Sequence, residues 1–165
     1  MPDYRGKIER KAQNLLHPGE RVLATVRAAP VGSPLAAAGG LVVLAIVSTQ
    51  RAKTAQEQGF PASSGMVLAV TDLRLLVFRQ NFGLKYRGEL PLEKIRGVSL
   101  ERRSLGLRLR FVLSSRAEVT FSTYRADHPD QFVEAVNRAV QARVPVTPPD
   151  ATARPTPAVP PPPPR

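Results

Sequence analysis

Few residues of this chain carry side chains placed for covalent chemistry. Asp72 follows Thr71 in a tight-turn pair, and Ser114 and Ser115 precede Arg116 in a second turn. A catalytic Asp or Ser needs another group placed to move a proton. The sequence places no His, Cys or second carboxylate to work with Asp72, and the two serines lack the nucleophile-elbow pattern. Turn formation explains these residues better than catalysis does, so we expect no enzymatic activity.

Metal and cofactor sites lack the necessary parts as well. The 165 residues include no Cys and two His, His17 and His128, each beside a proline. The composition therefore excludes disulfides and Cys-based zinc sites, and two separate histidines are too few for a His-rich site. The pair Gly39-Gly40 lacks the pattern of a phosphate-binding loop. We expect no catalytic residue, no metal and no cofactor.

The positive charge is the strongest chemical signal. The formal net charge is +11, which favours anionic partners, although an Arg-rich composition can also reflect genomic base composition. If the basic side chains cluster, they attract phosphate-bearing surfaces, and if they scatter, they form a solvated exterior. Because stacking aromatics are not interleaved with them, we expect lipid or protein rather than nucleic acid. The candidate contacts are Arg74, Arg79, Lys85, Arg87, Arg102, Arg103, Arg108 and Arg110, of which the last four form the best local cluster.

An uncharged apolar run lies in an insertion at residues 29–65. The run covers 31–49 and is just long enough to span a bilayer. It is a transmembrane helix, a helix packed on the domain or on a partner, or an apolar segment that dips into a membrane surface. Both flanks are expected in one sheet, and a single span would separate them, which argues against the first interpretation. The candidate membrane or partner contacts are Leu41, Val42, Val43, Leu44, Ile46 and Val47.

Seven strand-like runs followed by one amphipathic helix occupy residues 20–143. The strands are predicted at about 20–28, 66–70, 74–79, 84–90, 95–102, 105–113 and 117–122. The last two alternate apolar and polar residues most cleanly, which predicts an antiparallel hairpin. The helix is predicted to begin near His128 with Asp127 as its cap. Its buried stripe is Phe132, Val136, Ala139 and Val140.

The two ends of the chain are predicted to lie outside this domain. Residues 3–16 carry a narrow apolar stripe that predicts a short helix, stopped by Pro18-Gly19, so that residues 1–19 precede the domain. Residues 144–165 hold ten of the 17 prolines, which predicts a disordered tail of polyproline II character, either a linker or a ligand for an aromatic groove. The polar opening residues lack the pattern of a secretory signal, so we expect a cytoplasmic location, peripheral at the inner face of the membrane.

Three segments resemble a known family. They are "LLHPGERVLATVRA" at 15–28, "VLAVTDLRLLVF" at 67–78 and "GELPLEKIRGVSLE" at 88–101, which are similar to bacterial pleckstrin-homology-like and GRAM-like domains. The resemblance implies a mainly β fold, a seven-stranded partly open barrel of two packed sheets that is plugged at one end by the last helix. It also implies a binding module without catalysis. Arg27 matches the first position of the phosphoinositide-binding signature, but the second strand has no Lys or Arg, so we do not carry that site over.

Two functions follow as hypotheses. The first is a non-enzymatic binding module that associates with an anionic membrane surface through a basic face and the apolar insertion. The alternative is a protein–protein adaptor, with a homo-oligomer as one form, that uses the insertion and the Pro-rich tail.

Overall fold

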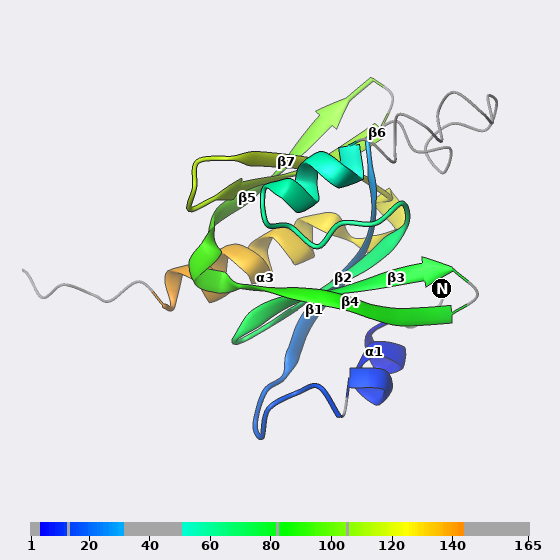
Figure 1. Cartoon of the computed structure of the whole chain (residues 1–165), viewed down its shortest axis with the longest axis vertical. Coiled ribbons are helices and arrows are strands. Elements are labelled where there is room, and N and C mark those ends of the chain that lie inside the picture. Colours follow the sequence, from blue (N-terminus) through cyan, green and yellow to red (C-terminus); the bar gives the residue numbers. More distant parts are fainter. Residues whose placement is uncertain (1–3, 13, 32–50, 82, 105, 144–165) are drawn as a thin grey trace, which may run out of the picture.

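The computed structural model describes residues 4–12, 14–31, 51–81, 83–104 and 106–143 of the chain (Figure 1). Seven strands run between a short N-terminal helix and a longer C-terminal helix, as the sequence predicts. The elements are α1 (Tyr4–Ala12), β1 (Val22–Pro30), β2 (Met66–Thr71), β3 (Arg74–Asn81), β4 (Gly83–Pro91), η2 (Leu92–Lys94), β5 (Ile95–Arg103), β6 (Gly106–Leu113), β7 (Glu118–Thr123), η3 (Arg125–Asp127) and α3 (Pro129–Gln141).

The strands form one sheet in the order β4-β3-β2-β1-β7-β6-β5, and every pair is antiparallel. Strand β1 bridges the two halves, because its residue Val26 pairs with Leu68 of β2 and its residue Ala29 pairs with Ser122 of β7. Strands β4 and β5 follow each other in the chain but lie at opposite edges of the sheet. The fold is therefore the expected partly open barrel, built from one continuous sheet rather than two separate ones.

Helix α3 packs on the inner face of this sheet. Phe132, Val136 and Ala139 are buried in the main core, and Val140 is half-buried against it, so the predicted stripe is confirmed. The predicted cap is wrong. His128 is the N-cap residue, in the left-handed conformation with φ of 49°, and the Asp127 carboxylate instead accepts two hydrogen bonds from the Arg27 guanidinium, at 2.7 and 2.9 Å. A bidentate guanidinium is a stronger partner for a carboxylate than a single helix amide.

The insertion contributes to the same core. Residues 51–57 are helical, and Ala52, Ala55, Phe60 and Ala62 are buried in the main cluster. The Phe60 ring lies 5.2 Å from the Phe111 ring and 4.8 Å from the Phe121 ring. The helical part of the insertion that the structure describes is thus small and packs on the domain. The predicted contacts between Leu41 and Val47 lie outside the described residues. Within the described ranges, no helix is both long and apolar enough to cross a membrane.

A second, smaller core lies on the outer face of β1–β4. Val67, Ala69, Leu76 and Phe78 alternate along β2 and β3 with residues of the main core, and Ile8 of α1 is fully buried against them. Helix α1 is shorter than predicted and ends at Ala12. Strand β2 therefore packs against a hydrophobic core on each face of the sheet, which explains why it is buried at every position.

Candidate functional site

Three of the predicted cations lie at the end of the sheet where the insertion begins. The register places Ala28 of β1, Met66 of β2, Arg79 of β3 and Lys85 of β4 in one row. Ala28 is two residues from the end of β1, and β1 leads into the insertion. The two described flanks of the insertion also meet, because Arg51 Nη1 donates to the carbonyl of Val31 at 2.7 Å. Arg79, Lys85 and the nearby Arg87, hereafter the hairpin cations, therefore share one end of the molecule with the insertion.

The hairpin cations bring like charges close together on neighbouring strands. Arg79 and Lys85 are directly opposite each other in β3 and β4, and all three hairpin cations are exposed. Like charges placed directly opposite on neighbouring strands destabilise a sheet. The only acid between residues 74 and 91 is Glu89, whose carboxylate is held by Arg74 and by the Tyr86 hydroxyl, which donates at 2.9 Å. The three exposed cations thus concentrate positive charge at this end of the hairpin.

Arg74 belongs to the fold rather than to this surface. Its side chain is 13% exposed, and its Nη2 donates to Glu20 Oε2 at 3.0 Å and to the Leu15 carbonyl at 2.6 Å. The Glu20 side chain is 0% exposed and also accepts from the Thr71 hydroxyl at 2.7 Å. Burial alone would raise the pKa of Glu20, but hydrogen bonds from Arg74, the His17 amide and Thr71 outweigh it and lower that pKa. The Glu20–Arg74 pair ties the turn before β1 to β3.

The predicted turn at Thr71-Asp72 is present, and it joins the same network. The Thr71 hydroxyl accepts from the amides of Leu73 and Arg74 at 3.1 and 3.0 Å, while the Asp72 carboxylate accepts from the Arg21 amide at 3.0 Å. The Thr71 side chain thus holds main-chain groups of its own turn, whereas Asp72 ties the turn to the residue before β1. Among the residues that the structure describes, no group of three or more His, Cys, Asp or Glu could hold a metal ion.

The remaining predicted cations form a separate group on the hairpin of β5 and β6. Arg103 pairs with Glu101 at 2.9 Å, and Arg110 pairs with Glu101 at 3.4 Å and with Glu118. Hydrogen bonding from Arg103 lowers the pKa of Glu101. Arg108 is half-buried opposite Glu101, and Arg102 is exposed. Glu101 and Glu118 therefore offset much of the positive charge of this group. The strand order places the group at the opposite edge of the sheet from the hairpin cations.

Helix α1 supplies cations that the sequence interpretation missed. Lys11 Nζ donates to the carbonyl of Leu84 at 2.8 Å, next to Lys85, and Arg10 lies in the same last turn of the helix. The signal was present in the sequence, because residues 5–11 hold four cations and one acid. A narrow apolar stripe does not say on which surface a short helix docks, so the sequence could not place these charges beside the hairpin.

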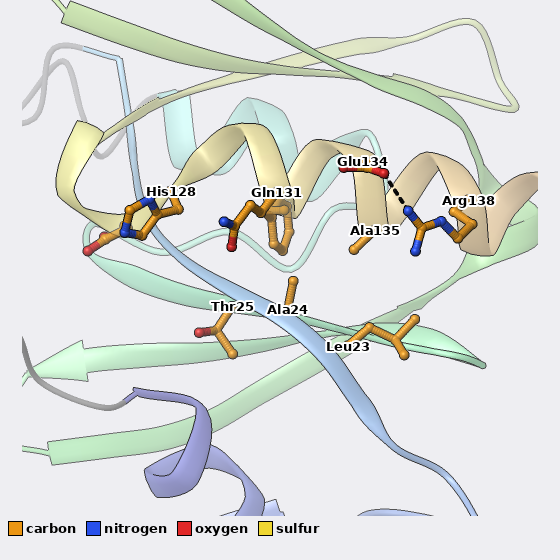
Figure 2. Close-up of a pocket in the computed structure, with 10 residues that line it drawn as sticks. Leu23, Ala24, Thr25, His128, Gln131, Glu134, Ala135 and Arg138 are labelled. Atoms are coloured by element: carbon orange, nitrogen blue, oxygen red, sulfur yellow. Dashed lines mark hydrogen bonds and ion pairs between the residues drawn. The ribbon is translucent and has the colours of Figure 1, made fainter.

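A groove that the sequence did not predict lies between the first half of β1 and α3 (Figure 2). Leu23, Ala24 and Thr25 form one side of the groove. The other side comes from η3 and α3 and from the residue between them: Asp127, His128, Gln131, Phe132, Glu134, Ala135 and Arg138.

One antiparallel sheet of seven strands, bent into an open barrel and plugged by a C-terminal helix, defines the pleckstrin-homology class of binding domains. Sequence comparison identifies the family within that class. The family described as "Bacterial PH domain" matches residues 16–138, and the chain belongs to this family. No curated protein matches the chain. Helix α1, with Lys11 beside the hairpin, lies outside the matched residues.

Proposed function

We propose that this bacterial PH domain binds an anionic membrane surface with the hairpin cations, while the apolar insertion enters the lipid beside them. The observation that carries the proposal is the row from Ala28 to Lys85, which joins the cations and the start of the insertion at one end of the sheet. The inner leaflet of the plasma membrane, reached from the cytoplasm, is the surface that fits this chemistry.

The charges alone give weak binding. A Lys or Arg close to an anionic leaflet contributes about 1 kcal/mol, so the three hairpin cations with Lys11 supply about 4 kcal/mol. That free energy corresponds to a Kd of about 1 mM. Stable peripheral association therefore needs a second contribution, and burial of apolar side chains in the interface is the usual one. Leu41, Val42, Val43, Leu44, Ile46 and Val47 are suited to that role, because β1, which leads into their segment, finishes at the same end of the sheet as the cations.

Vesicle co-sedimentation of the full chain tests the proposal. We expect binding to phosphatidylcholine vesicles that contain phosphatidylserine, weaker binding at high salt, and little binding to phosphatidylcholine alone. Arg79→Gln, Lys85→Gln and Arg87→Gln together should lower the affinity about a hundredfold, because three contributions of about 1 kcal/mol are lost. Arg102→Gln, Arg103→Gln and Arg108→Gln together are the matched control, with the same change of charge at the other edge. No sedimentation with either vesicle removes the proposal.

The alternative is a protein–protein adaptor that uses the insertion and the Pro-rich tail, with self-association as one form. Its supporting observation is the edge position of β4, where Tyr86 is 42% exposed. Deletion of residues 31–49 should then lower the number of chains per particle in solution, measured by light scattering. An unchanged number of chains argues against the self-associating form.

A further inference from the structure

The groove between β1 and α3 has a volume of 410 Å³, within the usual range of about 300–1,000 Å³ for ligand sites. Its apolar wall consists of Leu23 and Ala24 from β1 and Ala135 from α3. Leu23 is 40% exposed, which makes it one of two large apolar side chains exposed in the described part of the chain.

The edge of β1 that borders this groove is open. The Arg27 amide donates to Asp127 at 3.2 Å, and the Arg27 carbonyl accepts from the Thr123 hydroxyl at 2.9 Å, so the peptide groups of Arg27 face away from β2. Peptide groups two residues apart face the same side of a strand, and Thr25 therefore presents its N–H and C=O to the groove. Strand β7 pairs with β1 only from Ala28 to Pro30. Across the described ranges, no hydrogen bond reaches the Thr25 backbone from that side.

At β5, the other strand beside α3, the backbone groups of the edge are hydrogen-bonded by a side chain of the helix. The Asn137 side chain accepts from the Val98 amide at 2.9 Å and donates to the Val98 carbonyl at 2.8 Å. An amide side chain thus takes the place of a neighbouring strand at the β5 edge. Helix α3 forms no such bond with Thr25: in Figure 2 Gln131 lies on the α3 side of the groove across from Thr25, and no hydrogen bond joins the two.

We propose that the groove receives residues 150–154 of the same chain as a short strand added to the open edge of β1. The proposed segment reads Asp-Ala-Thr-Ala-Arg and is the longest stretch without proline after residue 144. Proline has no N–H to donate, so this stretch is the part of the tail that can pair along a strand edge. Successive side chains of a strand alternate between faces. In the proposed strand Ala151 and Ala153 would therefore face Ala24 and Ala135 together, with Thr152 on the opposite face.

The tail is long enough to reach the groove. The path from Arg143 back to Gln131 along α3 is about 18 Å at the helical rise of 1.5 Å per residue. Residues 144–152 span about 28 Å at the polyproline II rise of 3.1 Å per residue, which leaves length for the chain to reverse. In Figure 2 Arg138, which is ion-paired with Glu134, lies at the Leu23 end of the groove, so a tail that returns along α3 meets this pair first. Because the tail is tethered, its effective concentration is in the millimolar range, and a weak intrinsic affinity suffices.

Amide hydrogen exchange in the full ¹⁵N-labelled chain tests this inference. We expect the Thr25 amide to exchange about tenfold more slowly in the wild-type chain than in Ala151→Asp/Ala153→Asp, because a site closed nine tenths of the time exchanges about ten times more slowly. The substituted carboxylates would have to enter an apolar wall without a partner, which opens the site. Ala158→Asp/Val159→Asp adds the same two carboxylates outside the segment and should leave the wild-type rate. Equal Thr25 rates in the wild type and in the double variant would overturn the proposal.

Two further measurements distinguish the chain's own tail from a second copy of the chain as the occupant of the groove. Protection of Thr25 that is unchanged on dilution supports the chain's own tail, whereas protection that falls on dilution means that a second copy supplies the strand and overturns the proposal. From the groove side, Ala135→Leu should fill the space and raise the mobility of the Ala151 to Ala153 amides, measured by the heteronuclear NOE. Gln141→Leu on the same helix lies outside the groove and is the control. The groove does not involve the hairpin cations, so this result is independent of the vesicle experiment.

Discussion

The Glu20–Arg74 pair gives the sharpest test of the fold. Arg74→Met keeps the length and packing of the side-chain stem but leaves the Glu20 carboxylate, which is 0% exposed, without its cation. Removing one partner of a buried pair costs about 3–5 kcal/mol. We expect about 3 kcal/mol here, because the Thr71 hydroxyl and the His17 amide still bind Glu20. The free energy of unfolding of a domain is about 5–15 kcal/mol, so Arg74→Met would remove a large fraction of the stability.

Urea unfolding followed by circular dichroism measures this loss. Glu20→Gln/Arg74→Met should be more stable than Arg74→Met alone, since no charge is then stranded. The control, Arg110→Met, breaks ion pairs at the surface and should change the unfolding midpoint little. The reasoning is refuted if Arg74→Met unfolds at the same urea concentration as Arg110→Met, or if removing Glu20 as well makes the loss worse.

The pH dependence of the same pair has a definite sign. The pKa of Glu20 in the folded chain lies below its ordinary value of 4.5, so the folded state favours the ionised form. The stability from this group is therefore present above pH 4.5 and is lost as the pH falls through the lower, folded pKa. In Arg74→Met the stranded carboxylate is protonated in acid, so the difference from the wild type should shrink between pH 7 and pH 4. A difference that grows over this range would contradict the assignment.

Two other substitutions test how the edges and the insertion are held. Phe60→Ala should cost about 3–5 kcal/mol, because the ring is fully buried between Phe111 and Phe121; a thermal melt like that of the wild type would mean that the insertion does not pack in the core. Asn137→Ala should cost about 1–3 kcal/mol and speed the exchange of the Val98 amide, because it removes both hydrogen bonds to the β5 edge; an unchanged Val98 amide would show that another group closes this edge.

Much of the fold could be predicted because its signals are local. The alternation in β6 and β7 and the stripe of Phe132, Val136 and Ala139 identify buried faces directly, and all lie where the sequence places them. The cap at Asp127 failed because its partner, Arg27, is 100 residues away. Phe60 was missed for a related reason, since it lies in a polar stretch and its partners come from β6 and β7.

The candidate site was predictable in composition but not in arrangement. Eight cations could be named from the sequence, but only the strand order shows that they lie at two edges of one sheet. Whether a cation is available depends on the acids that the register brings to it. The ion pair with Glu20 holds Arg74 in a largely buried position, and Glu101 and Glu118 offset the charge of Arg110. The open backbone of Thr25 leaves no trace in the sequence, because it depends on where β7 ends.

Site-specific fluorescence tests most directly whether the insertion enters the membrane beside the hairpin cations. The chain has no Cys, so Leu44→Cys accepts one environment-sensitive fluorophore in the insertion. Ser99→Cys places the same label at an exposed position of β5. On addition of phosphatidylserine-containing vesicles, the account predicts a blue shift for the label at position 44 and none for the label at position 99. Equal responses of the two labels, or no response at position 44 while the protein sediments with the vesicles, would contradict it.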